Sequence, residues 1–158
     1  MPGVRTRGPF PDLALPDLEG RTHPLAEAWS KGEGLFLLGH RNCKTTRETI
    51  PYFDRIHRRS RAGHGVRLVL QDDVETARTL VTTMGLAVPV RLEGDPYPLA
   101  EALGLVTVPT LFLVDRAGAI AHVSEAFNRA DLETLAARVG VEGPLFTADD
   151  RAPAFKPG

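Results

Sequence analysis

The sequence contains a single cysteine, Cys43, among its 158 residues. One cysteine cannot close an internal disulfide, so the chain has no disulfide framework and carries no mark of an oxidising compartment. It also lacks an uncharged apolar run long enough to cross a bilayer. The first residues, MPGVRTRGPFPDL, lack the apolar core of a secretory signal. We therefore expect a cytoplasmic protein with no membrane partner.

An excess of charge of one sign is missing as well. The net charge is −1, with 25% charged and 42% hydrophobic residues, as in an ordinary soluble globular protein. Because this balance does not attract a polyanion, we expect no nucleic-acid partner. Cys43 and His40 supply only two metal ligands where three or four are usual. Dinucleotide-binding glycine motifs and G-x-S-x-G nucleophile motifs are absent, so the sequence predicts no metal and no cofactor.

Alternating apolar runs and helical patterns predict an α/β fold. Short continuous apolar runs are typical of buried strands, and there are three of them: GLFLLG (34–39), VRLVL (66–70) and TLFLVD (110–115). Helical spacing extends from Cys43 to about Arg61 and recurs in three later segments: DDVETARTLVTTMGL, YPLAEALGL and RADLETLAARVG. The segment VPVRL at 88–92 fits either an edge strand or a loop. This order predicts a central mixed sheet with helices on both faces.

The chain divides into one domain and a tail. Residues 1–140 are enough for a single domain with its own core. Residues 141–158, VEGPLFTADDRAPAFKPG, have few apolar residues in any stretch. We expect this C-terminal tail to be loosely ordered or to lie on the surface.

Cys43 directly follows a predicted strand and a short loop, and it directly precedes a predicted helix. Asn42 is a good N-cap residue, which would place the thiol in the first helical turn. Free backbone N–H groups and the positive end of the helix dipole favour a thiolate there, and Lys44 and Arg47 add positive charge. Thr46 lies on the same helix face, where its hydroxyl can donate a hydrogen bond to the sulfur. A lone cysteine is often a small buried hydrophobe, but the polar neighbours of Cys43 favour a reactive thiol.

Three segments together resemble one family. CKTTRETIP resembles the C-x-x-C helix of TlpA-like and peroxiredoxin-like (AhpC/TSA) redoxins, in which a proline follows the first cysteine by eight residues, as Pro51 does. LGLVTVPTLFLVDRAGAI is similar to the segment of that family that contains VPT, and PDLALPDLEGRTHPLAEAW resembles its N-terminal hairpin. The resemblance extends from about Phe10 to Val139. It implies a thioredoxin-like fold with an N-terminal β-hairpin extension.

The resemblance also implies a role for the VPT segment. By comparison with the family, Pro109 after Val108 is expected to form a cis peptide bond that faces the thiol. The backbone beside this proline then pairs with an incoming substrate. Without the resemblance, the sequence would not favour a cis bond over an ordinary trans-proline at the start of a strand.

The sequence departs from the family pattern at the second cysteine. Thr46 occupies the position of the resolving thiol, so this chain cannot release a mixed disulfide by itself. An external thiol, such as thioredoxin, glutathione or a partner protein, would have to complete the reaction. The peroxidase pattern P-x-x-x-T-x-x-C is also unmatched, since His40 and Phe36 stand at its threonine and proline positions. His40 is either a group that tunes the thiolate or a solvated loop residue.

Two functions remain open at this stage. The first is a thiol-dependent oxidoreductase, acting on disulfide-bearing proteins or on peroxides, with Cys43 as its only thiol. In that hypothesis Thr46 and Pro109 complete the catalytic site, while His40, Asn42, Lys44, Arg47 and Val108 tune the thiolate or bind the substrate. The second is a binding or scaffold protein on the same fold that has no redox activity.

Overall fold

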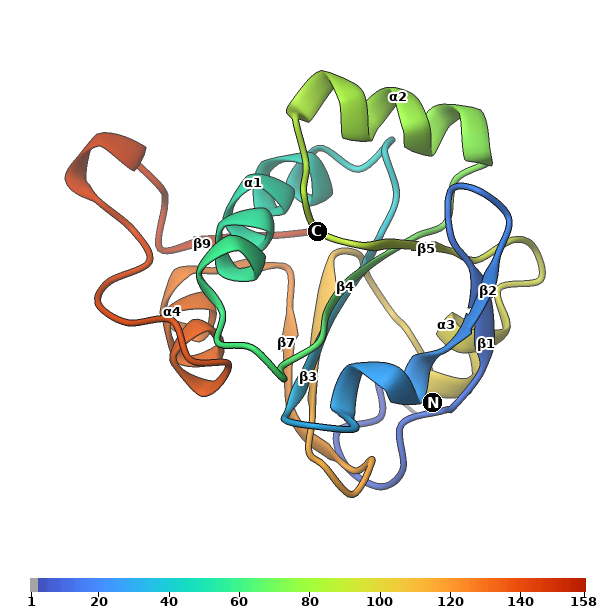
Figure 1. The fold of residues 1–158 in the computed structure, drawn as a ribbon. Coiled ribbons are helices and arrows are strands. Elements are labelled where there is room, and N and C mark those ends of the chain that lie inside the picture. Colours follow the sequence, from blue (N-terminus) through green and yellow to red (C-terminus); the bar gives the residue numbers. More distant parts are fainter. Residues whose placement is uncertain (1–2) are drawn as a thin grey trace.

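The computed structural model describes residues 3–158, which form a mixed five-stranded sheet covered by helices (Figure 1). In spatial order the strands are β5 (Val90–Leu92), β4 (Val66–Leu70), β3 (Gly34–Gly39), β6 (Thr110–Val114) and β7 (Ile120–Glu125). β3, β4 and β5 are parallel, while β6 and β7 each run antiparallel to the preceding strand in this order. The predicted α/β fold is therefore confirmed, and the segment at 88–92 contributes the edge strand β5.

Two apolar clusters cover the two faces of the sheet. One contains side chains of α1 (Lys44–Arg59), α2 (Val74–Met84) and α4 (Arg129–Arg138). The other contains side chains of the N-terminal segment, the short 3-10 helix η1 (Leu25–Trp29) and α3 (Pro98–Leu103). Alternate residues of the central strand β3 belong to opposite clusters, so its whole apolar run is buried.

Two small antiparallel pairs lie outside the central sheet. β1 (Ala14–Pro16) pairs with β2 (Thr22–Pro24), which gives the N-terminal hairpin that the sequence predicts. β8 (Phe127–Asn128) pairs with β9 (Phe155–Lys156), the last strand of the chain. Between α4 and β9 lies one further turn of 3-10 helix, η2 (Ala148–Asp150).

The C-terminal tail contains buried apolar residues near its start. Leu145 is fully buried and Phe146 is 5% exposed, and both belong to the cluster beneath α1 and α4. Phe146 stacks against Tyr52 of α1 with ring centroids 4.6 Å apart. These two apolar residues help to anchor the tail on the domain, although the segments around them are polar. The tail then follows α1 toward the N-terminal end of that helix (Figure 1).

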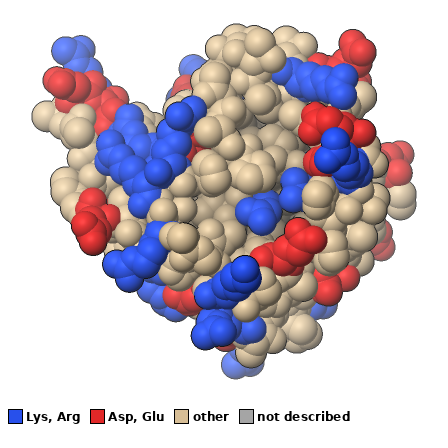
Figure 2. All heavy atoms as spheres, viewed as in Figure 1, with Lys and Arg blue, Asp and Glu red and all other residues tan. Residues whose placement is uncertain are grey.

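Acidic and basic side chains are interspersed over the face shown in Figure 2. Within residues 3–158, none of the helices combines the length and apolar character that a membrane span requires.

Asp54 connects α1 to the loop between α2 and β5. Its carboxylate accepts hydrogen bonds from the backbone N–H groups of Ala87 and Val88, both at 2.8 Å, and from Arg58 Nε at 2.7 Å. Burial alone would raise the pKa of Asp54, but these donors outweigh it and hold the pKa below the usual 3.8. Asp54 is thus a charged anchor for the edge of the sheet.

We expect Asp54→Asn to destabilise the protein by about 1–3 kcal/mol at neutral pH, because an amide cannot satisfy all three donors. Since the pKa of Asp54 is lowered by folding, its contribution is complete above pH 3.8 and is lost as the pH falls below that value. Urea unfolding of both proteins across this range measures the effect. A difference in stability that stays constant down to strongly acidic pH would contradict this role.

Candidate functional site

Cys43 lies at the junction between β3 and α1, and it is itself the N-cap of the helix. Its backbone is extended, with φ −84° and ψ 117°, and helical geometry begins at Lys44. The sequence prediction that Asn42 is the N-cap is therefore wrong by one residue. The physical reason is that the cysteine sulfur caps the helix in the way that an asparagine side-chain oxygen usually does. It accepts a hydrogen bond from the backbone N–H of Thr46 at 3.4 Å.

The sulfur is half-buried and faces the segment before β6. Cys43 Sγ lies 3.4 Å from the carbonyl oxygen of Val108, to which the thiol donates. The peptide bond between Val108 and Pro109 is cis, and Pro109 is buried. The structure thus brings together residues 65 positions apart in the sequence, and the sulfur has a donor on one side and an acceptor on the other.

Thr46 also lies close to Cys43, but its contacts differ from the prediction. The backbone N–H of Thr46, and not its hydroxyl, donates a hydrogen bond to the sulfur. The side chain is fully buried against Gly39 at the end of β3, and its hydroxyl oxygen has no hydrogen-bond partner among the described residues. The position that would hold a resolving thiol is therefore filled by a threonine packed against the strand.

The predicted charged neighbours have other partners. The Lys44 ammonium is 72% exposed and lies 3.9 Å from the Glu48 carboxylate, one helical turn away. The Arg47 guanidinium donates to the carbonyl oxygen of Arg41 in the loop before the helix. Neither side chain forms a hydrogen bond with the sulfur. The bond from Arg47 instead connects α1 to the loop that precedes it.

A groove adjoins the Val108 segment. His40 lines it together with Tyr97, Val106 and Val108, and its volume is about 380 Å³. Val106 is 69% exposed. His40 is half-buried, and its carbonyl oxygen accepts the N–H of Cys43 at 3.2 Å. Of the predicted site residues, His40, Cys43, Thr46, Val108 and Pro109 thus lie together.

Sequence reasoning missed the part of the site that the tail contributes. The hydroxyl of Thr45, in the first turn of α1, donates to the carbonyl oxygen of Pro157 at 2.5 Å. The Lys156 ammonium lies 2.5 Å from the Glu48 carboxylate. The only signal of this contact in the sequence is the apolar pair Leu145–Phe146, which anchors the tail upstream.

These features define a thioredoxin-like redoxin: a half-buried cysteine at the start of a helix, opposite the residue that precedes a buried proline, on a five-stranded mixed sheet. The chain matches the AhpC/TSA family model over residues 6–123, and it belongs to that family. No three histidine, cysteine or acidic side chains within residues 3–158 are grouped so that they could hold a metal ion.

A curated relative is 28% identical over 117 residues, which cover 72% of this chain: the thiol-disulfide oxidoreductase ResA of Geobacillus thermodenitrificans. The match spans 65% of the length of that relative. Among solved structures, a putative thiol:disulfide interchange protein DsbE from Chlorobium tepidum is similar, with a TM-score of 0.76 and 22% identity over 87% of this chain and 96% of that one. A putative protein disulfide isomerase from Bacteroides thetaiotaomicron has a TM-score of 0.77 and 15% identity, over 86% of this chain and 88% of that one. Both structures support the thioredoxin-like fold.

Proposed function

We propose that this protein is a thiol-disulfide oxidoreductase that reacts through Cys43 alone and depends on an external thiol. The observation that carries the proposal is the position of the sulfur, which caps α1 and accepts the N–H of Thr46. A helix N-terminus stabilises a thiolate, and the thiolate is the form that attacks disulfides. The name of the curated relative is consistent with this chemistry.

The reaction proceeds in three exchanges. The Cys43 thiolate attacks one sulfur of a substrate disulfide, a Cys43–substrate disulfide forms, and the other substrate sulfur leaves as a thiolate that takes up a proton. Because Thr46 has no sulfur, an external thiolate must then attack the mixed disulfide. If it attacks the substrate sulfur, Cys43 is released as a thiolate. The substrate is thereby left in mixed disulfide with the external thiol, and a second external thiol completes its reduction.

The partners follow from this scheme. One is a disulfide-bearing protein, and the other is a small or protein thiol of the thioredoxin or glutathione type. Cys43 is half-buried, and its sulfur contacts Val108, which lines an open groove. This arrangement favours a protein substrate with an accessible disulfide over a small molecule that binds in a closed cavity.

Peroxide reduction is the second candidate, because the AhpC/TSA family match covers most of the chain. In that reaction the Cys43 thiolate attacks one peroxide oxygen and the O–O bond breaks. The sulfur becomes a sulfenic acid, and the other oxygen leaves as hydroxide or alkoxide, which takes up a proton. External thiols then reduce the sulfenic acid with loss of water. Residues Phe36 and His40, which stand where the peroxidase pattern has proline and threonine, make this the weaker candidate.

One experiment separates the candidates. Reduced protein is treated separately with a neutral disulfide and with hydrogen peroxide, and the products are identified by mass spectrometry, with Cys43→Ser as the control. We expect rapid formation of one disulfide adduct per chain on Cys43, and slow oxidation by peroxide. Faster reaction with peroxide would favour the second candidate. No reaction of Cys43 with either reagent would contradict both candidates and leave a binding or scaffold role.

A further inference from the structure

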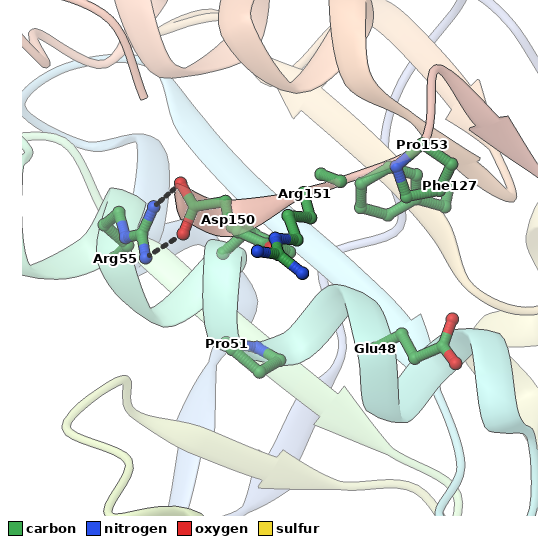
Figure 3. A pocket seen from close by; sticks show the side chains of 9 residues that line it. Glu48, Pro51, Arg55, Phe127, Asp150, Arg151 and Pro153 are labelled. Atoms are coloured by element: carbon green, nitrogen blue, oxygen red, sulfur yellow. Dashed lines mark hydrogen bonds and ion pairs between the residues drawn. The ribbon is translucent and has the colours of Figure 1, made fainter. Parts of the chain in front are cut away.

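The C-terminal tail is held at separate points along α1. Near the C-terminal end of the helix, the Arg55 guanidinium forms two hydrogen bonds with the Asp150 carboxylate, at 2.9 and 3.1 Å (Figure 3). It forms a third with the carbonyl oxygen of Leu145. The Arg55 side chain holds the pKa of the Asp150 carboxyl well below its usual range, so this clamp stays charged across physiological pH.

Between this clamp and β9, the tail bridges a cavity rather than packing directly on the helix. The cavity has a volume of about 270 Å³ and lies between α1 and the segment around Arg151 and Pro153 (Figure 3). Beyond it, the N–H of Arg129 donates to the carbonyl oxygen of Ala154 at 3.0 Å, and β9 pairs with β8. The tail is therefore fixed by separate points, with a loosely packed stretch between them.

The end of the tail lies directly on the Val108 segment. A Cβ atom added to Gly158 would overlap both the Val108 carbonyl oxygen and the Thr107 hydroxyl, so only a residue without a side chain fits there. This carbonyl is the one that the Cys43 thiol contacts. Thr45 and Glu48 hold the two preceding residues from the other side. Residues 155–158 are thus an extended segment that crosses the surface next to the sulfur.

We propose that the surface between the first turn of α1 and residues 107–108 is a docking groove for an extended polypeptide, and that residues 155–158 occupy it as an intramolecular competitor. This inference rests on the proposed function, because it concerns access to Cys43. A polypeptide whose disulfide reaches the sulfur has to displace these residues. A small disulfide does not, because Cys43 is only half-buried with the tail in place.

The contacts that hold the tail end favour reversible displacement. The Lys156–Glu48 ion pair is partly exposed, with the two side chains 33% and 38% exposed, and pairs of this kind contribute little to stability. The β8–β9 ladder contains only two residue pairs. The tail end can therefore detach while the Arg55–Asp150 clamp and the buried Leu145 keep the rest of the tail in place.

The test compares two neutral reagents that release the same thiopyridyl group: an ethyl disulfide and an extended peptide disulfide. In both reactions the reagent S–S bond breaks, a disulfide to Cys43 forms, and pyridinethione is released and measured by its absorbance. Lys156→Glu replaces the ion pair with repulsion of Glu48, and Gly158→Leu displaces the end of the tail without a change of charge. The control is Lys31→Glu, the same change of charge at an exposed lysine.

We expect both tail variants to react about two- to fivefold faster than the parent with the peptide disulfide, and at the parental rate with the ethyl disulfide. Lys31→Glu should match the parent with both reagents. Unchanged rates with the peptide reagent in both tail variants would overturn the proposal. Equal acceleration with both reagents would also overturn it, since it would show an effect on the sulfur rather than on docking. Failure of the parent to react with the ethyl disulfide would instead refute the proposed function, and the docking proposal with it.

Discussion

The parent protein, treated with one equivalent of a neutral disulfide, is expected to stop at a persistent Cys43 mixed disulfide. The buried residue one turn further along α1 is Thr46, which has no sulfur to attack that bond. In Thr46→Cys, by contrast, the second thiol lies in the same helical turn, and the backbone N–H at that position already contacts Cys43 Sγ. We expect this variant to release the substrate thiol and to close a disulfide between Cys43 and the introduced thiol, because an intramolecular thiol acts at a very high effective concentration.

Mass spectrometry of the intact protein over time measures the difference between the two products. The control is Thr49→Cys, which adds a buried cysteine to the same helix about 9 Å of helical rise from Cys43, beyond the reach of a disulfide. That variant should keep the mixed disulfide as the parent does. Spontaneous loss of the adduct from the parent, without added thiol, would contradict the single-thiol mechanism.

The second large effect is expected at the contact between Gly39 and Thr46. A Cβ atom at Gly39 would lie 2.5 Å from Thr46 Cγ2 and 2.9 Å from its hydroxyl oxygen, and both residues are buried. Gly39→Ala should therefore destabilise the protein by about 1–3 kcal/mol through overpacking. Adding Thr46→Ala removes both clashing atoms and leaves only Thr46 Cβ, at 3.3 Å, so it should restore most of the lost stability.

Urea unfolding of the two single variants and the double variant gives the coupling free energy between the two sites. The control is Gly94→Ala, because a Cβ there meets no atom within 4 Å and should change stability by less than about 0.5 kcal/mol. If the effects of Gly39→Ala and Thr46→Ala simply add, Thr46 is not packed against the strand as described.

The sequence predicts the sheet well because its signals are local. Continuous apolar runs such as 34–39 and 66–70 can be buried only in a strand covered on both faces, and both are central strands of the sheet. The start of the helix at Lys44 is also close to its predicted place. The exact cap is not predictable from residue type, because Asn42 and Cys43 can both accept a backbone N–H.

The contacts of the C-terminal tail and of the charged side chains could not be predicted from the sequence, for a different reason. Contacts such as Thr45 with Pro157 and Glu48 with Lys156 join residues more than 100 positions apart, and no local pattern specifies them. Leu145 and Phe146 are too few to signal a packed segment, although both are buried in the structure. The charged residues Lys44 and Arg47 have the expected place in the sequence, but nearer partners than the sulfur engage their side chains.

The most direct test of the central claim is whether the fold itself makes Cys43 more reactive. The rate of its reaction with methyl methanethiosulfonate, a small neutral reagent, is measured at neutral pH in the native protein and in the urea-unfolded chain. N-acetylcysteine in the same solutions corrects for the effect of urea on the reagent. We predict a faster reaction in the native protein, because the N-terminal end of α1 and the Thr46 N–H stabilise the attacking thiolate. An equal or slower reaction in the native protein would contradict the account.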